Sequence, residues 1–248
     1  MIPTDSLNDT ATARSAAPAA VAVARNAARD GQAGTSAIRE VIHSFRSPIV
    51  RAYSRVRFTI VRQPFLEEIG QYLPSSGDVL DLGCGFGLFS LFYAMTRPAL
   101  RIAAVDLDAG RVAAATASAE RLGLTNVTYE ASDATTWKTD RQFDAIYMLD
   151  LVHHLPQTRV PGFLADVTRL LRPSGILIIK DVADRPRYKM LFTLLLDRLL
   201  VGMEPIRYWP PAELMAVLTG LGFEVVRHRM NDILPYPHIL YVCRRRAS

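Results

Sequence analysis

The strongest constraint on the fold is an alternation of short apolar runs with helix-like segments between residues 78 and 182. The apolar runs have the length of β-strands, and the segments between them have the length and periodicity of helices. The strand-like runs are DVLDLG, RIAAVDLD, NVTYEASD, FDAIYMLD and GILIIKDV, and the helical ones are LFSLFYAMT, AGRVAAATASAERLG and VPGFLADVTRLL. This alternation predicts a parallel sheet with helices on both faces. Ligands bind such sheets at the carboxyl edge, so residues that follow each strand are the candidates for function.

The first strand-like run ends in a glycine-rich turn, VLDLGCGFG, at residues 79–87. Its three glycines allow a ligand to lie beside the backbone, near the N-terminus of the next helix. A nicotinamide-binding fingerprint would have a glycine at position 88, which is Leu88, and no Gly-Lys-Ser/Thr of a phosphate-binding loop follows. Asp81 precedes the turn, and a carboxylate there suits a cationic ligand better than a pyrophosphate.

Acidic residues follow the next strand-like runs in order. Asp106 lies about 20 residues beyond the glycines, where an acid can accept hydrogen bonds from both hydroxyls of a ribose. Asp133 follows the third run and can accept a hydrogen bond from an adenine amino group, and Asp150 ends the fourth. Each acid alone is also typical of a turn or a helix cap. Their succession at neighbouring strand ends favours one shared ligand site.

These motifs, with SDA, FDAIYMLDLVHHLP and LLRPSGILIIKDV, resemble the successive motifs of class I S-adenosylmethionine-dependent methyltransferases over residues 79–182. The resemblance implies an α/β, Rossmann-like seven-stranded sheet of order 3-2-1-4-5-7-6, with the last strand antiparallel and helices on both faces. FEVVRHRM and HILYVCRRR would supply the last two strands. Ser174 followed by Gly175 replaces the usual second glycine of one turn, a change that a turn tolerates. The implied cofactor is S-adenosyl-L-methionine.

The resemblance also implies a role for each residue of the cofactor site. The glycines pass beside the methionine part, Asp81 lies near its ammonium group, Asp106 holds the ribose, and Asp133 meets the adenine. Asp150 either lines the methionine part or orients the methyl acceptor. The cofactor-binding residues so predicted are Asp81, Gly83, Cys84, Gly85, Gly87, Asp106, Leu107, Asp133, Ala134 and Asp150.

Methyl transfer from a sulfonium needs few catalytic groups, because the enzyme mainly aligns the reactants. A hydroxyl or phenol acceptor benefits from a base, and histidine suits that task near neutral pH. The run DLVHHLP supplies His153 and His154, and Asp181 follows the fifth strand-like run. We predict these three as catalytic residues. Packing of the loop is the alternative role for either histidine.

The acceptor is expected to contact segments outside the shared core, and an arginine-rich helix before the first strand is one candidate. Residues 38–62 hold six arginines and a single acid, a local excess equal to the net charge of +5 of the whole chain. Ile49, Tyr53, Val56 and Ile60 repeat at helical spacing. The basic face is either solvated or binds an acidic group of the acceptor, in which case Arg51, Tyr53 and Arg57 are the predicted contacts.

The second candidate is the segment Met190–Val201, which is apolar on nearly every helical face. Such a segment must be buried against something. Three alternatives remain open: packing in the core or in a homodimer, a lid over a hydrophobic acceptor, and contact with a membrane surface. For the lid, Phe192 and Leu195 are the predicted acceptor-binding residues.

The composition of the chain predicts where the folded domain and its segments begin and end. Residues 1–37 are rich in Ala and Ser and predict a disordered tail. Asp5, Asp9 and Asp30 argue against a transit peptide. Residues 38–248 predict one methyltransferase domain, divided into an N-terminal helical lid (38–73), a cofactor-binding core (79–182), a helical insertion (184–212) and a C-terminal helix and strand pair (213–248).

The remaining composition narrows the class of protein. Cys84 and Cys243 lack metal-type spacing, so no metal site or disulfide is expected. No apolar run reaches the roughly 20 residues of a membrane span, and we expect a soluble, cytoplasmic enzyme. It would methylate a small hydrophobic acceptor that bears a phenol, hydroxyl or carboxylate. The alternatives are a non-catalytic cofactor-binding protein and an RNA methyltransferase. No nucleic acid partner is expected, because basic residues concentrate only in the arginine-rich helix and at 244–246.

Overall fold

The computed structural model describes residues 32–182, 209–229 and 238–246. The predictions for residues 1–31 and for most of the helical insertion, including Phe192 and Leu195, lie outside the described residues. Among the described residues no helix combines the length and the apolar character that crossing a membrane requires.

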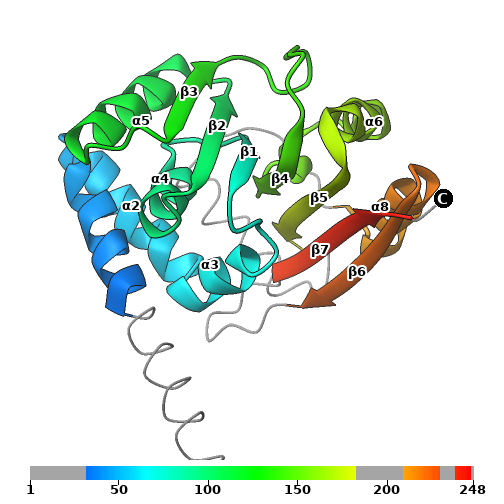
Figure 1. Cartoon of the computed structure of the whole chain (residues 1–248), viewed down its shortest axis with the longest axis horizontal. Coiled ribbons are helices and arrows are strands. Elements are labelled where there is room, and N and C mark those ends of the chain that lie inside the picture. Colours follow the sequence, from blue (N-terminus) through cyan, green and yellow to red (C-terminus); the bar gives the residue numbers. More distant parts are fainter. Residues whose placement is uncertain (1–31, 183–208, 230–237, 247–248) are drawn as a thin grey trace, which may run out of the picture.

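Seven strands form one sheet of order β3-β2-β1-β4-β5-β7-β6, which confirms the predicted topology (Figure 1). The strands β1 to β5 pair in parallel, and β7 pairs antiparallel with both β5 and β6. Their bounds are β1 Gly77–Leu82, β2 Leu100–Asp106, β3 Val127–Ala131, β4 Phe143–Leu149, β5 Leu171–Val182, β6 Phe223–Arg229 and β7 His238–Arg245. Each strand overlaps one of the seven strand-like runs identified in the sequence.

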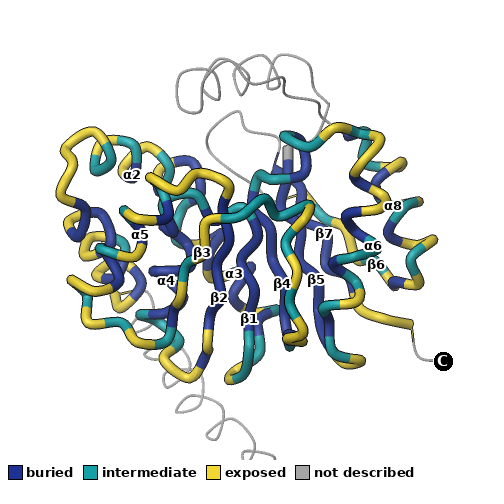
Figure 2. Tube along the Cα trace, turned by 90° about the horizontal axis from the view of Figure 1, so that it is seen from above, coloured by how far each residue is buried: buried dark blue, intermediate teal, exposed yellow. Residues whose placement is uncertain are grey.

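Alternate residues of the central strands pack into two separate cores, because successive side chains of a strand point to opposite faces. In β4, Ala145 and Tyr147 belong to one core, and Ile146 and Met148 belong to the other. The first core is covered by α4 (Leu88–Thr96) and α5 (Ala109–Arg121) together with the N-terminal helices, and the second by α6 (Val160–Leu170) and α8 (Pro211–Gly220) (Figure 1). Figure 2 shows the central strands buried between these layers.

The N-terminal helices begin earlier than the sequence indicated. Residues 32–44 are helical in the described part of the chain, so the predicted boundary of the disordered tail at residue 37 is wrong. Ala37 is buried in the first core, and the Thr35 hydroxyl donates a hydrogen bond to Gln63 Oε1 at 2.7 Å. The residues of this segment are small, so the helix can pack closely against its neighbours. The same small residues gave the segment the composition of a disordered tail. At the other end, α8 begins at Pro211, two residues before the predicted boundary.

Helix α2 (Pro48–Ile60) and helix α3 (Gln63–Gly70) complete the predicted helical lid. The predicted apolar face of α2 is only partly buried. Ile60 is buried, but Ile49 is 79% exposed, and Phe58 is buried instead. The reason is the orientation of the helix, which turns Tyr53 toward the glycine-rich turn, where its ring centroid lies 5.2 Å from that of Phe86.

Candidate active site

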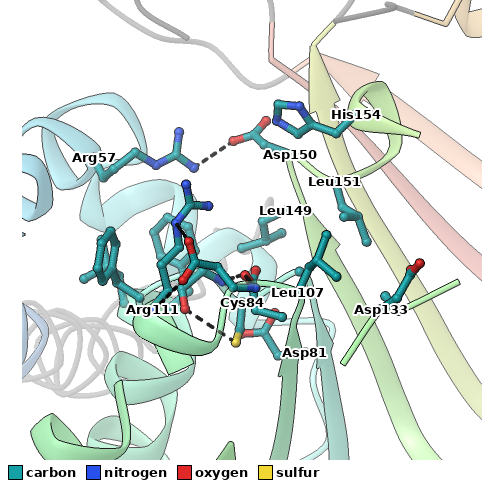
Figure 3. Close-up of a pocket in the computed structure, with 18 of the residues that line it drawn as sticks. Arg57, Asp81, Cys84, Leu107, Arg111, Asp133, Leu149, Asp150, Leu151 and His154 are labelled. Atoms are coloured by element: carbon teal, nitrogen blue, oxygen red, sulfur yellow. Dashed lines mark hydrogen bonds and ion pairs between the residues drawn. The ribbon is translucent and has the colours of Figure 1, made fainter. Parts of the chain in front are cut away.

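A cavity of about 640 Å³ opens at the carboxyl ends of β1, β2 and β4, beside α2 (Figure 3). Its volume lies within the range of small-molecule sites. Most of the predicted site residues line it, from both the cofactor and the acceptor sets. They are Tyr53, Arg57, Asp81, Gly83, Cys84, Gly85, Asp106, Leu107, Asp133, Ala134, Asp150, His153 and His154. The sheet therefore brings together the ends of successive strands, as the sequence predicted.

The glycine-rich turn joins β1 to α4 through three residues with positive φ. The φ angles are 77° at Gly83, 56° at Gly85 and 69° at Gly87. A Cβ atom at Gly85 would have no neighbour within 4 Å, so the backbone there is open to a ligand. A Cβ atom at Gly87 would lie 2.6 Å from the Tyr129 ring. Gly87 is not among the residues that line the cavity. It caps α4 and accommodates Tyr129, and its predicted contact with the cofactor stays a prediction.

Asp106 ends β2 and braces the turn. The Gly85 N–H donates to Asp106 Oδ2 at 2.7 Å, and the Asp108 N–H donates to Oδ1 at 3.0 Å. Each carboxylate oxygen can accept a second hydrogen bond. The buried carboxylate therefore holds the turn in place and keeps acceptor capacity for the hydroxyls of a ligand.

Asp81 lies beneath the turn and is buried, with 3% of its surface exposed. The Tyr147 hydroxyl donates to Asp81 Oδ2 at 2.9 Å. Burial raises the pKa of the Asp81 carboxyl to about 7, and the hydrogen bond from Tyr147 opposes that rise. Without a ligand this carboxyl is therefore partly protonated at neutral pH, and a cation bound beside it would favour the charged form.

This raised pKa predicts a pH-dependent affinity for a ligand with an ammonium group. S-Adenosylhomocysteine, the demethylated product of the cofactor, carries that group and is expected to bind about tenfold more weakly at pH 6.0 than at pH 7.5, because Asp81 must lose its proton on binding. Calorimetric titration at the two pH values measures the ratio. In Asp81→Asn the affinity is expected to be low at both values. Equal affinities of the unmodified protein would contradict an ammonium contact at Asp81.

Asp133 and Leu107 form the outer end of the cavity. Asp133 Oδ1 accepts hydrogen bonds from the Thr135 N–H at 2.8 Å and from the Thr135 hydroxyl at 2.7 Å. Oδ2 accepts none from the residues that the structure describes, and it remains available to a ligand. Leu107 is 73% exposed, an unusual state for a leucine next to a buried strand, and it can cover a flat ligand group.

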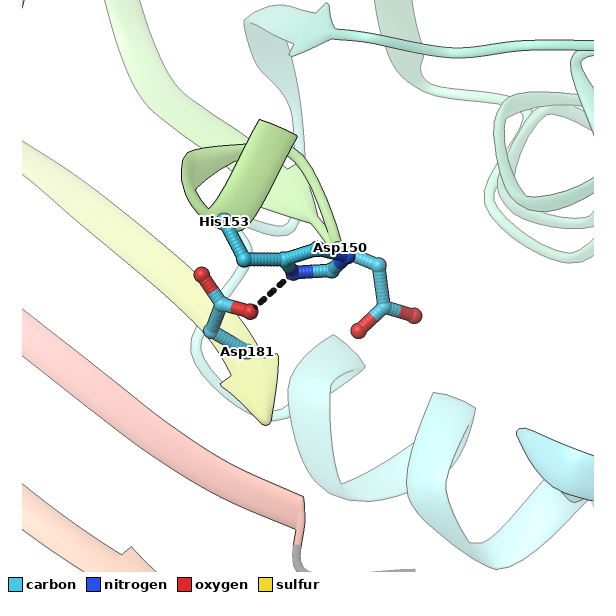
Figure 4. Close-up of side chains that lie close together, drawn as sticks. All are labelled: Asp150, His153 and Asp181. Atoms are coloured by element: carbon cyan, nitrogen blue, oxygen red, sulfur yellow. Dashed lines mark hydrogen bonds and ion pairs between the residues drawn. The ribbon is translucent and has the colours of Figure 1, made fainter. Parts of the chain in front are cut away.

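The other end of the cavity contains the two histidines of the 3-10 helix Val152–His154, which follows β4. His153 Nδ1 is hydrogen-bonded to Asp181 Oδ1, and both side chains are almost completely buried (Figure 4). Asp181 does not line the cavity itself but lies behind His153. The His154 ring centroid lies 4.2 Å from that of His153, and burial followed by the neighbouring His153 lowers the pKa of His154 to about 4. His154 is therefore neutral at physiological pH.

Asp150 connects three elements at the acceptor end. Lys180 Nζ, on β5, lies 2.5 Å from Asp150 Oδ1. Arg57 Nη2, on α2, lies 3.0 Å from Asp150 Oδ2 (Figure 3). Burial alone would raise the pKa of Asp150, but Lys180 and Arg57 hold it well below its usual range. Both oxygens have cationic partners, and Asp150 lines the cavity, so its contact with the methionine part of the cofactor or with the acceptor stays a prediction.

The structure places the three predicted acceptor contacts of the arginine-rich helix differently. Arg57 lines the cavity, and its guanidinium forms an ion pair with Asp150. An acidic group of an acceptor would therefore compete with Asp150 for this guanidinium. Arg51 does not line the cavity, and its Nη2 donates to the Arg46 carbonyl oxygen at 3.0 Å. Tyr53 lines the cavity as predicted.

Asp150, His153 and Asp181 hold potential metal-ligand atoms within 4.8 Å of one another (Figure 4). The neighbouring positive charges disfavour a metal ion at this cluster. Asp150 already forms ion pairs with the ammonium of Lys180 and the guanidinium of Arg57. A divalent ion bound to the same carboxylate would lie beside both cations, and the repulsion in this buried environment would be strong. The ion pairs account for the cluster without a metal.

Two features of the site were not predicted from the sequence: the buried Lys180 and the aromatic side chains that line the cavity. Lys180 is fully buried, and its signal was a lone charge in the apolar run GILIIKDV. Phe86 and Phe89 line the cavity from the turn and from α4, and Arg111 from α5 lies with its guanidinium carbon 5.8 Å from the Phe86 ring centroid. A phenylalanine between glycines was a readable signal, whereas Phe89 could not be distinguished from a core residue.

Comparison with known proteins agrees with the geometry. Residues 79–175 match the family model described as a methyltransferase domain. The ubiquinone biosynthesis O-methyltransferase of Rickettsia canadensis (strain McKiel) is 23% identical over 154 residues, which cover 60% of this chain and 63% of that protein. The (S)-coclaurine N-methyltransferase of Papaver somniferum is 28% identical over 107 residues, which cover 43% of this chain and 30% of that protein. The structure of an O-methyltransferase family protein from Burkholderia thailandensis superposes with a TM-score of 0.63 at 18% identity, over 79% of this chain and 60% of that one.

The sheet order, the glycine-rich turn and the acids that follow β1 and β2 define a Rossmann-like nucleotide-binding fold of the methyltransferase type. Residues 79–175 match a methyltransferase domain, and the chain has the fold of the class I S-adenosylmethionine-dependent methyltransferases. The chain spans less than two thirds of the length of either of these curated relatives.

Proposed function

We propose that this protein methylates a hydroxyl or phenol oxygen of a small, largely apolar acceptor, with S-adenosylmethionine as methyl donor. The observation that carries the proposal is His153, which lines the cavity and is hydrogen-bonded to the buried Asp181. A histidine fixed by a carboxylate on one ring nitrogen presents the other nitrogen as a base.

The described residues fit the proposed cofactor. Asp106 keeps acceptor capacity for two ribose hydroxyls, the backbone at Gly85 is unobstructed, and Asp81 offers a buried carboxylate to an ammonium group. Leu107 and Asp133 lie at the outer end, where an adenine ring would be covered and hydrogen-bonded. When bound, S-adenosylmethionine supplies an electrophilic methyl group on a sulfonium sulfur.

The acceptor end supplies the remaining chemistry. If His153 Nδ1 carries the proton shared with Asp181, His153 Nε2 holds a lone pair and can take the proton of an acceptor hydroxyl. Figure 4 shows the His153 ring between Asp181 and Asp150, so two carboxylates stabilise the imidazolium that forms. His154, which is neutral because its pKa lies at about 4, can donate or accept a hydrogen bond at the acceptor. The main work of the site is to align the acceptor oxygen and to hold its proton.

The side chains that line the cavity favour a particular class of acceptor. Tyr53, Phe86, Phe89 and Leu155 give the cavity an apolar and aromatic lining next to the histidines. A ring that carries a hydroxyl would pack on this lining and direct its oxygen at His153. A carboxylate acceptor would be ionised already and would need no base, so the histidine favours hydroxyl and phenol acceptors over it.

Transfer of a trideuteromethyl group from labelled S-adenosylmethionine tests this proposal. The purified protein is incubated with matched aromatic acceptors that differ only in one substituent: a phenol, a benzylic alcohol, an aniline or a benzoate. We expect the label to appear on the phenol or alcohol oxygen in mass spectra of the products. Label on the aniline nitrogen would overturn the choice of oxygen, and label in added RNA would favour the nucleic acid alternative. Cofactor binding without label in any acceptor would favour a non-catalytic protein.

A further inference from the structure

Lys180 is a fully buried lysine at the carboxyl end of β5, behind the acceptor end of the cavity. Its ammonium lies 2.5 Å from Asp150 Oδ1, and its carbonyl oxygen accepts a hydrogen bond from the Asp150 N–H at 2.8 Å. Burial of an ammonium group costs free energy unless the group is paired with a carboxylate. The burial of a lysine at the end of β5 therefore indicates a specific role for its ion pair. The two contacts tie both the side chain and the backbone of Asp150 to β5.

Asp150 also forms an ion pair with a residue of α2. Its second oxygen accepts a hydrogen bond from Arg57 Nη2 at 3.0 Å, and the two side chains are only 11% and 12% exposed. The Arg57 guanidinium carbon also lies 5.7 Å from the Phe89 ring centroid. Lys180, Asp150 and Arg57 thus form one chain of charges from β5, across the end of β4, to α2. Figure 3 shows its second link, between Asp150 and Arg57.

The backbone of Asp150 is held in an unusual conformation at the centre of this chain. Its φ is 63°, and among the described residues it is the one non-glycine residue with a positive φ. Such conformations persist where the surroundings over-determine them, and they cluster at functional sites. Here the ion pairs on both carboxylate oxygens and the hydrogen bond of the N–H to Lys180 fix the residue.

We infer that Lys180 is a positioning residue: through Asp150 it holds Arg57 and thereby keeps α2 against the acceptor end of the cavity. Tyr53 lies one helical turn before Arg57 and lines the same cavity, so the position of α2 sets the shape of the acceptor wall. The role in acceptor binding depends on the proposed function. The mechanical coupling between β5 and α2 does not.

Hydrogen exchange of the full-length protein, without cofactor or acceptor, tests the coupling directly. In Lys180→Met and in Arg57→Met we expect the amides of α2 to exchange at least tenfold faster than in the unmodified protein, with the amides of β1, β2 and β4 unchanged. Arg55→Met is the matched control, because Arg55 lies on the same helix with an exposed side chain. Its exchange is expected to equal that of the unmodified protein. Combining Lys180→Met with Arg57→Met should add nothing, because the two act in one chain.

Lys180→Met leaves Asp150 with one cation fewer, so the folding of this variant is measured first. The double variant Asp150→Asn with Lys180→Met removes both buried charges, and it is expected to release α2 as well. The inference is overturned if a folded Lys180→Met or the double variant exchanges α2 amides at the unmodified rate, or if exchange rises equally across the sheet. Once an acceptor is known, Lys180→Met should raise its KM while the affinity for S-adenosylhomocysteine stays within about threefold. The exchange result holds or fails whether or not methyl transfer is detected.

Discussion

Replacing His153 with glutamine is expected to lower kcat by about 10²–10⁴, the usual contribution of a positioned general base. Glutamine has a similar size and keeps hydrogen-bonding capacity, but it cannot take a proton from the acceptor. The affinity for S-adenosylhomocysteine is expected to stay within about threefold, because the glycine-rich turn and Asp106 are untouched. Steady-state kinetics with the acceptor identified by label transfer, together with calorimetry, measures both quantities.

His154→Gln is the matched control for this prediction. His154 also lines the cavity, but it is not the histidine hydrogen-bonded to Asp181. Its loss is expected to lower kcat by less than about tenfold, as for a hydrogen-bonding group rather than a base. Asp181→Asn should resemble His153→Gln, because an amide would no longer fix the ring in the productive tautomer. If His153→Gln retains the unmodified kcat, the histidine pair packs the loop and the proposed base is wrong.

Replacing Asp106 with alanine is expected to weaken S-adenosylhomocysteine binding by roughly 1–3 kcal/mol, the cost of leaving buried polar groups without a charged acceptor. Two effects contribute. The ribose hydroxyls lose their carboxylate, and the Gly85 N–H loses the hydrogen bond that holds the turn. Calorimetric titration of the variant and the unmodified protein gives the difference in binding free energy.

Asp133→Ala is a useful control for the Asp106 variant, because it removes an acid from the outer end of the same cavity. We expect it to weaken binding by less, since Asp133 Oδ1 is already engaged by Thr135 and the ligand loses one hydrogen bond at most. Unchanged affinity in Asp106→Ala would mean that the ribose lies elsewhere. The unfolding midpoint of each variant must be measured as well, because Asp106 also stabilises the turn.

The cofactor end of the site was predictable from the sequence, because local chemistry determines it. The glycines at 83, 85 and 87 all have positive φ, and Asp81, Asp106 and Asp133 each lie within two residues of the carboxyl end of a strand. Parallel strands bring their carboxyl ends to one edge, so sequence order alone placed these residues together. The close packing of Gly87 could not be read from the sequence, because its neighbour Tyr129 lies 42 residues away in the chain.

The acceptor end could not be predicted to the same extent, because it is built from distant segments. Arg57 and Asp150 are 93 residues apart, and Asp150 and Lys180 are 30 apart. Periodicity identified α2 as a helix but not its rotation, which depends on how Phe58 and Ile60 pack in the core. The helix from residue 32 was missed for a related reason, since its small residues are stabilised by tertiary contacts rather than by their own composition.

Calorimetric titration of the unmodified protein with S-adenosylmethionine, S-adenosylhomocysteine and NAD tests the central claim most directly. The account predicts saturable binding of the first two at one site per chain and no binding of NAD, because Leu88 replaces the glycine of a nicotinamide-binding turn and Asp81 favours an ammonium group over a pyrophosphate. Saturable binding of NAD with no binding of S-adenosylmethionine would contradict the account.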